Sequence, residues 1–231
     1  GDSRYIRLSV EGYGGMNCAS WLDRPLTAAG RAIVRTGEGV EGRLVYLDQD
    51  LLTIPSLAIH QQRDVNRGHD YNAQKDMQPL YALSGGTPLT ALVAEELGVE
   101  AGDILSTDLM LCPRQRPVYL GPEGELFQAP RIDDLGCAYA ALEGFLTAGG
   151  SRRFGQIYCL FDNEEVGSGT RQGALSTFLP DVLARIGEVL GLSAQDARRA
   201  LANSLLLSAD NGHAVHPNFP EKADPSNRVY P

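Results

Sequence analysis

The chain has 231 residues, of which 43% are hydrophobic, with 26 glycines and 13 prolines. This length and apolar content suit one large domain or two small ones and argue against intrinsic disorder. The formal net charge is -9 at pH 7. An acidic surface repels phosphate groups, so nucleic acid and anionic membranes are disfavoured as partners.

The four cysteines, at positions 18, 112, 137 and 159, form no CxxC pair. Cys137 and Cys159 lie in apolar runs that are typical of buried small hydrophobic residues. A disulfide framework is not expected at this chain length and cysteine density, and a reducing, cytoplasmic location fits best. We find no apolar run long enough to span a bilayer and no signal peptide.

The first part of the chain is predicted to be rich in β-structure. The opening GDSRYIRLSV indicates a strand, and residues 31–36 and 42–48 carry β-branched and aromatic residues between Gly-rich turns. Residues 103–112 and 116–120 have the same pattern, and GPEG at 121–124 predicts a turn. One helix is expected at 89–97, with Thr87 as its cap.

From Ala129 the pattern changes to alternating helices and strands. The apolar spacing in DLGCAYAALEGFLT predicts a helix that ends at Gly149, and a second helix is expected from Leu179. Ser193 and Asp196 form a capping box for a third. Residues 155–161 and 204–210 are apolar runs typical of buried strands.

The predicted fold class is therefore α/β, with a mostly parallel sheet flanked by helices and interrupted by a β-rich insertion. We assign residues 1–18 to the catalytic α/β domain, 19–127 to the insertion, and 128–231 to the catalytic domain again.

Carboxylates follow the predicted strand ends and precede the long helix. Glu164 and Glu165 come after the strand at 155–161, Asp210 follows the strand at 204–210, and Asp133 stands at the helix start. Ligands bind at the carboxyl ends of parallel strands, so these side chains are expected to gather. Gathered carboxylates repel one another unless cations intervene, which indicates a site for two divalent cations with a free Glu as general base.

Each of these residues also has an ordinary interpretation. Adjacent Glu residues are usually a solvated face, Asp133 has the position of a helix cap, and Asp210 that of a turn residue. His213 and His216 are compatible with surface or capping roles. A pair of carboxylates that acts without metal, as in glycosidases, also stays open.

Five segments resemble the aspartyl aminopeptidase family, in family order. They are YGGMNCASWLDRPLTAAGR (13–31), IPSLAIHQQRDVN (54–66), APRIDDL (129–135), FDNEEVGSGTRQGA (161–174) and SADNGHAVHPNFPEK (208–222). Together they span nearly the whole chain. Where the family usually has Met-Ala before the His, this chain has Asn211-Gly212, and we expect that change to affect local packing only.

The resemblance implies a metallo-aminopeptidase that removes N-terminal Asp or Glu from peptides with two zinc ions per subunit; cobalt or manganese could replace zinc. It implies that Glu164 is the general base, that Asp133 bridges the metals, and that Glu165 and Asp210 each bind one. His213 would contact substrate, and His60 would reach the active site of the neighbouring subunit. The inserted domain would mediate homo-oligomerisation, as dimers that stack into a dodecamer.

Two metal-binding histidines of the family have no counterpart among the four histidines of this chain. A zinc ion normally takes three or four protein ligands, so we expect a central fragment that is inactive by itself. A non-catalytic assembly module, or a dinuclear-metal hydrolase of broader specificity, stays as an alternative.

Overall fold

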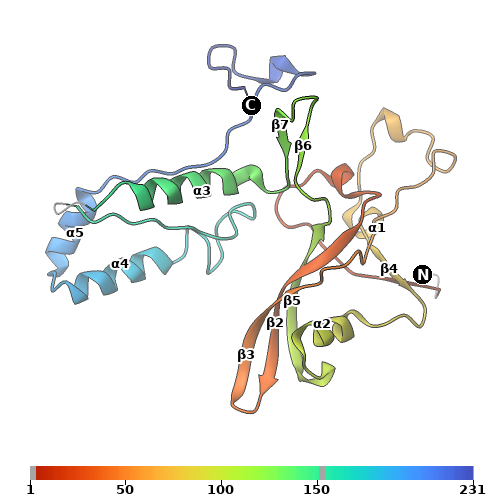
Figure 1. Ribbon diagram of the computed structural model, residues 1–231, viewed down its shortest axis with the longest axis horizontal. Helices are drawn as coiled ribbons and strands as arrows, with labels where there is room; N and C mark the ends of the chain where they lie inside the picture. The colour runs from red at the N-terminus through yellow and green to blue at the C-terminus, as the bar shows by residue number, and fades with distance from the viewer. Residues whose placement is uncertain (1–3, 151–153, 231) are drawn as a thin grey trace. The chain divides into compact units, whose positions relative to one another are not determined.

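The computed structural model describes residues 4–150 and 154–230, which form two compact units, 1–128 and 129–231 (Figure 1). The opening strand is found as β1 (Tyr5–Arg7), which pairs antiparallel with β4 (Leu80–Leu83). Residues 1–3 of that prediction lie outside the described residues. Since β1 pairs within the first unit, the assignment of residues 1–18 to the catalytic domain stays a prediction.

The first unit is built on a three-stranded antiparallel sheet in the order β3-β2-β5. Its strands are β2 (Leu26–Thr36), β3 (Gly39–Tyr46) and β5 (Ile104–Pro113), as the sequence predicted. Gly30 is required in the central strand, because a Cβ there would overlap the carbonyl oxygen of Asp108 on β5. Helix α2 (Leu89–Leu97) packs its Val93 against Ala28, Ala32, Val34, Val45 and Leu47 of the sheet region.

The predicted cap of α2 is wrong. The N-cap position is Pro88, which makes no side-chain capping hydrogen bond. Thr87 instead accepts a hydrogen bond from the Tyr81 hydroxyl through its backbone carbonyl, at 2.7 Å. Pro88 fixes its own φ near the value that the helix start needs, so the cap does not depend on a threonine hydroxyl.

A second core cluster of the first unit consists of Leu26 from β2 and of Leu52, Ile54 and Met77 from the long loop of residues 47–79. That loop contains two short turns of helix, η2 (Val65–Arg67) and α1 (Ala73–Asp76); the others in this unit are η1 (Cys18–Trp21) and η3 (Ala101–Asp103). A hairpin of β6 (Val118–Leu120) and β7 (Leu126–Gln128) closes the unit, with the predicted turn between its strands.

The second unit contains the three predicted helices, α3 (Ile132–Thr147), α4 (Phe178–Val189) and α5 (Ala194–Ala202), and a short turn, η4 (Pro220–Lys222). One half of the predicted capping box is found, because the Ser193 hydroxyl accepts the backbone N–H of Asp196 at 3.1 Å. The Asp196 carboxylate accepts a hydrogen bond from that hydroxyl at 2.6 Å. The Tyr158 hydroxyl donates to the carbonyl of Ala138, which holds the segment 155–161 on α3.

The mostly parallel sheet is not found among the described residues. The strand pairs are antiparallel, and residues 155–161 and 204–210 belong to no strand. An apolar run becomes a strand only when a neighbouring strand takes its backbone hydrogen bonds. Here Leu205 and Leu207 are 94% and 88% exposed, so the second unit is α/β in pattern without an assembled sheet.

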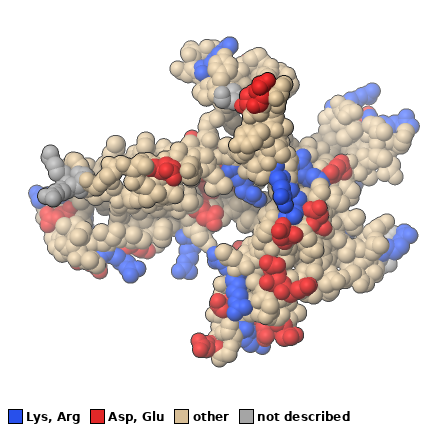
Figure 2. Space-filling model, in the orientation of Figure 1, with Lys and Arg blue, Asp and Glu red and all other residues tan. Residues whose placement is uncertain are grey.

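Acidic and basic side chains are interleaved over the β3-β2-β5 sheet on the face that Figure 2 shows. All four cysteines are free thiols. Within residues 4–150 and 154–230, no helix has the length and apolar character needed to cross a membrane.

Candidate active site

Asp133 lies at an irregular start of α3. Arg131 has a left-handed backbone (φ 61°), and the backbone angles of Asp133 and Asp134 are not helical, so the regular helix begins after Asp134. The Asp133 side chain is exposed, and the N-cap position of α3 belongs to Arg131, so Asp133 is not the N-cap that its sequence position allowed.

Glu164 and Glu165 lie in a tight turn after the segment 155–161. Asn163 and Ser168 adopt left-handed backbone angles of 62° and 60° at the two ends of that turn. The turn is closed by bonds from the N–H of Ser168 to the carbonyl of Asn163 at 3.0 Å and from the Thr170 hydroxyl to Asn163 Oδ1 at 2.8 Å. Both Glu side chains are exposed, so the turn presents them rather than burying them.

Asp210 belongs to an extended segment held against the start of α3. Its Oδ1 accepts the N–H of Asn211 at 2.7 Å, and Asn211 Oδ1 in turn accepts the N–H of Cys137 at 3.1 Å. The Asp210 carboxyl also forms a side-chain hydrogen bond with Asp133.

The carboxyl groups influence one another electrostatically. The pKa of Asp133 is raised, first by its hydrogen bond to Asp210 and also by lost hydration and the charges of Asp210, Glu165 and Asp134. The pKa of Glu164 is raised by lost hydration and by repulsion from Glu165, Asp210 and Asp133. The four predicted carboxylates therefore lie near enough to influence one another's charge, and their assembly into one metal site stays a prediction.

The donor set suits divalent cations. Within the described residues, no group of three or more His, Cys, Asp or Glu side chains has metal-holding geometry. Repulsion from neighbouring carboxylates is nevertheless among the causes that raise the pKa values of Asp133 and Glu164, after the Asp210 hydrogen bond and lost hydration, and a cation would relieve that repulsion. Carboxylate oxygens are ligands for zinc, although a complete zinc site needs more donors than three carboxylates for two ions. The residues present thus fit part of a metal site.

The histidines are placed separately. His213 is exposed and lies in the same segment as Asp210. His216 Nδ1 accepts the N–H of Asn218 at 3.1 Å, and its ring contacts Phe219, so His216 is a turn residue. His60 is exposed in the first unit, in a turn where the N–H of Gln62 bonds to the carbonyl of Ala58.

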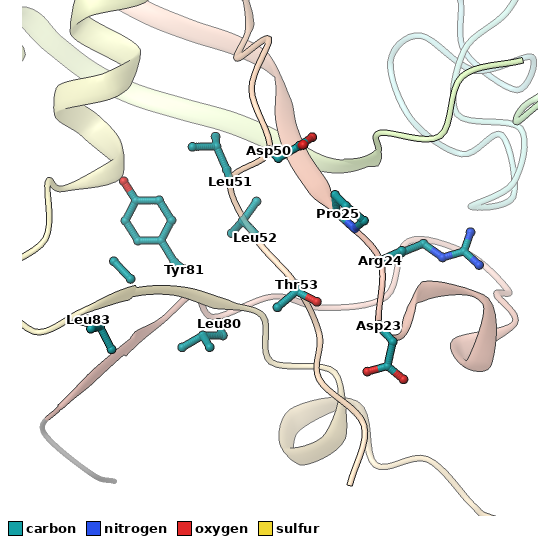
Figure 3. Close-up of a pocket in the computed structure, with 11 residues that line it drawn as sticks. Asp23, Arg24, Pro25, Asp50, Leu51, Leu52, Thr53, Leu80, Tyr81 and Leu83 are labelled. Carbon is teal, nitrogen blue, oxygen red and sulfur yellow. The ribbon is translucent and has the colours of Figure 1, made fainter. Parts of the chain in front are cut away.

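A hollow of about 530 Å³ lies entirely within the first unit and contains none of the predicted site residues. Leu51, Leu52 and the segment 80–83 line one side of it, and Asp23 and Arg24 lie at its other end (Figure 3). The pKa of Asp23 is lowered because its carboxylate accepts two hydrogen bonds from Ser56. The second carboxylate that lines the hollow, Asp50, accepts a hydrogen bond from Arg114 Nε at 3.1 Å, so both of its carboxylates have structural partners.

Two positions that support the site were not predicted. Asn211 was expected to matter for packing only, and Gly173 was not singled out. A Cβ at Gly173 would overlap the carbonyl oxygen of Ser168, so the turn that carries Glu164 and Glu165 requires glycine there. Neither role has a sequence signal, because each depends on a backbone group brought close by folding.

Comparison with known proteins identifies the chain. The Peptidase M18 family, described as "Aminopeptidase I zinc metalloprotease (M18)", matches residues 2–231. The chain belongs to the M18 family. A probable M18 family aminopeptidase 2 of Clostridium novyi is 40% identical, over 98% of this chain and 54% of its own length. An aspartyl aminopeptidase of Dictyostelium discoideum is 34% identical, over 97% of this chain and 56% of its own.

The M18 fold agrees as well. The mApe1 dodecamer of S. cerevisiae matches with a TM-score of 0.75 at 28% identity, over 98% of this chain and 53% of that one. The chain therefore has the mixed α/β fold of M18 aminopeptidases. It spans about half the length of the curated relatives it matches.

Proposed function

We propose that the protein containing this chain is a metallo-aminopeptidase that hydrolyses the first peptide bond after an N-terminal Asp or Glu. The electrostatic influence of Glu165 and Asp210 on both Asp133 and Glu164 is the observation that carries this proposal. Membership of a family of zinc metalloproteases and similarity to an aspartyl aminopeptidase support it.

Glu164 is the general base in this proposal. Its turn presents the side chain to solvent, where its carboxylate can accept a proton from a water molecule. The proton taken from the attacking water is then available for the departing amine. Glu165 comes from the same turn but, as its neighbour, points from a different backbone position and is free to serve as a metal ligand.

Asp133, Glu165 and Asp210 would hold the metal, with Asp133 shared between two ions. Two bound zinc ions would neutralise the carboxylates, polarise the scissile carbonyl and acidify a bound water. Two histidine ligands from outside these residues would complete the coordination. Cobalt or manganese would also suit such carboxylate and imidazole donors.

The oligomer and the substrate contacts are part of the same proposal. Similarity to a protein solved as a dodecamer supports a homo-oligomer, and we assign its dimer contacts to the β-rich insertion, residues 19–127. His213, next to the Asp210 segment, would contact substrate, and His60 would act in the active site of a neighbouring subunit. The substrates would be peptides with acidic N-termini.

We further propose that residues 155–161 and 204–210 are strands of a mostly parallel sheet in the complete protein. Three consecutive leucines, Leu205 to Leu207, are more than 80% exposed in these residues alone, and burial of such a run is strongly favourable. In such a sheet, the carboxyl ends of the two strands would lie next to Glu164 and Asp210.

Hydrolysis of Asp-, Glu-, Leu- and Ala-anilides by the full-length protein tests the function. Preferential cleavage of the Asp and Glu substrates, abolished by a chelator and restored by zinc, is the expected result. Equal or better cleavage of Leu and Ala substrates would favour a dinuclear hydrolase of broader specificity. No cleavage of any of the four by zinc-loaded protein would favour a non-catalytic assembly module.

A further inference from the structure

The N-cap residue of helix α3 does not cap the first N–H groups of that helix. Its N-cap residue, Arg131, makes no side-chain capping bond, and Asp133 and Asp134 are not helical. The first N–H groups of a helix have no partner within the helix, and they need an acceptor from elsewhere. Cys137 lies in this first regular turn.

The acceptor for Cys137 comes from a distant segment. Asn211 Oδ1 accepts the Cys137 N–H at 3.1 Å, in a part-buried position. Asn is among the residues whose side chains best satisfy helix N-termini, usually from the adjacent N-cap position. Here the capping amide comes from Asn211, which lies 74 positions along the chain from Cys137.

The neighbouring glycine makes room for this contact. A Cβ on Gly136 would lie 3.1 Å from Asn211 Nδ2 and 3.5 Å from Asn211 Oδ1. An alanine at 136 would therefore crowd the Asn211 amide, which would have to shift by a few tenths of an ångström. Gly144, in the same helix, has no atom within 4 Å of the corresponding position.

We propose that Asn211 is a positioning residue that caps α3 from a distance and thereby holds Asp210 beside Asp133. Asp210 is the residue before Asn211 and hydrogen bonds with Asp133, which lies just before the capped turn. The cap thus fixes the separation of two carboxylates on two different segments. The inference rests on the proposed metal site, in which both carboxylates bind metal.

The full-length protein carrying Asn211→Leu tests the proposal. Leucine has a similar size and no acceptor, and loss of a residue that orients metal ligands typically lowers metal affinity by about 10- to 100-fold. We expect that loss in zinc competition against a chelator, together with faster amide exchange at Cys137 in the metal-free protein. Asn211→Asp keeps the acceptor and should keep zinc affinity and Cys137 protection near the wild-type level.

A second pair of variants separates positioning from general stability. Gly136→Ala and Gly144→Ala both increase helix propensity, by up to about 1 kcal/mol relative to glycine. Of these two variants, we expect only Gly136→Ala to lower zinc affinity and to expose the Cys137 amide, with the helix content unchanged or higher. Gly144→Ala should leave both readouts unchanged.

Two results would overturn the inference. One is unchanged zinc affinity and Cys137 exchange in Asn211→Leu, and the other is an equal loss in Asn211→Asp and Asn211→Leu. Wild-type protein that binds no zinc at all would instead refute the proposed metal site, and Cys137 exchange in the metal-free variants would still report whether the cap exists.

Discussion

Asp133 and Asp210 share a side-chain hydrogen bond although they belong to segments far apart in the sequence. One precedes the regular part of α3, and the other ends an apolar run that the described residues leave uncovered. The pKa of Asp133 is raised by this contact, and a cation bound between the two carboxyl groups would remove their repulsion. The contact is one of the observations behind the proposed metal site.

The 231-residue chain by itself should bind zinc weakly and hydrolyse no Asp-anilide. Its three candidate metal-binding carboxylates are too few for two zinc ions, which normally take three or four protein ligands each. Zinc titration followed by the anilide assay checks this. Two tightly bound zinc ions with turnover would show that the chain is sufficient.

Full-length His60→Ala should bind zinc and oligomerise normally but be nearly inactive. An imidazole that donates a hydrogen bond to the developing negative charge is worth on the order of 10² to 10³ in rate. His60 lies exposed in a turn of the first unit, where its loss should not disturb the fold.

Mixing subunits tests whether His60 acts in trans. His60→Ala subunits mixed with Glu164→Gln subunits should recover part of the activity, because some sites then receive an intact base and an intact histidine. No recovery, with subunit exchange demonstrated, would place His60 outside the neighbouring site.

Full-length Gly173→Ala should lose most activity and zinc, because the new methyl group would overlap the Ser168 carbonyl in the turn that carries Glu164 and Glu165. The Ser168 carbonyl is part of the backbone, so it cannot move aside as the end of a flexible side chain could. Gly169→Ala is the matched control, since nothing lies within 4 Å of its Cβ position in the same turn. Zinc content and kcat of the two variants should differ sharply, and equal behaviour would contradict the role of Gly173.

Ser56→Ala should destabilise the first unit modestly, by about 1 kcal/mol, because it removes one of two hydrogen bonds to the exposed Asp23 carboxylate. The pKa of Asp23 is lowered, so its contribution is present above the ordinary Asp pKa, about 3.9, and is lost as pH falls through the folded value.

Urea unfolding of wild type and Ser56→Ala, at neutral pH and at acidic pH below the lowered Asp23 pKa, measures this dependence. The gap between the two proteins should shrink in acid. A gap that stays constant would mean that the hydrogen bond to ionised Asp23 contributes nothing.

The elements with strong local signals could be predicted from the sequence. Apolar spacing located α3, and the pairing of Ser193 with Asp196 located the start of α5. The prediction that Thr87 caps α2 was wrong, because Pro88 occupies the N-cap position and needs no hydroxyl group to start the helix. The apolar run at 204–210 has the composition of a strand, yet strand formation depends on a neighbour and not on composition.

Residue type alone indicated a candidate site, whereas the backbone contacts around it left no signal in the sequence. Carboxylates at three segment ends indicated that Asp133, Glu164, Glu165 and Asp210 would gather. The contact of Asn211 with Cys137 links a side chain to a backbone N–H, and any residue at position 137 except proline would supply that N–H. No pattern in the sequence marks such a pair.

The metal content and turnover of full-length Glu164→Gln and Glu165→Gln, measured side by side, test the central claim most directly. The amide preserves shape but cannot accept a proton, so Glu164→Gln should keep its zinc and lose about 10² to 10⁴ in rate. Glu165→Gln should lose zinc. Zinc retained in Glu165→Gln and lost in Glu164→Gln would reverse the two roles, and full activity in both would remove the carboxylate site from catalysis.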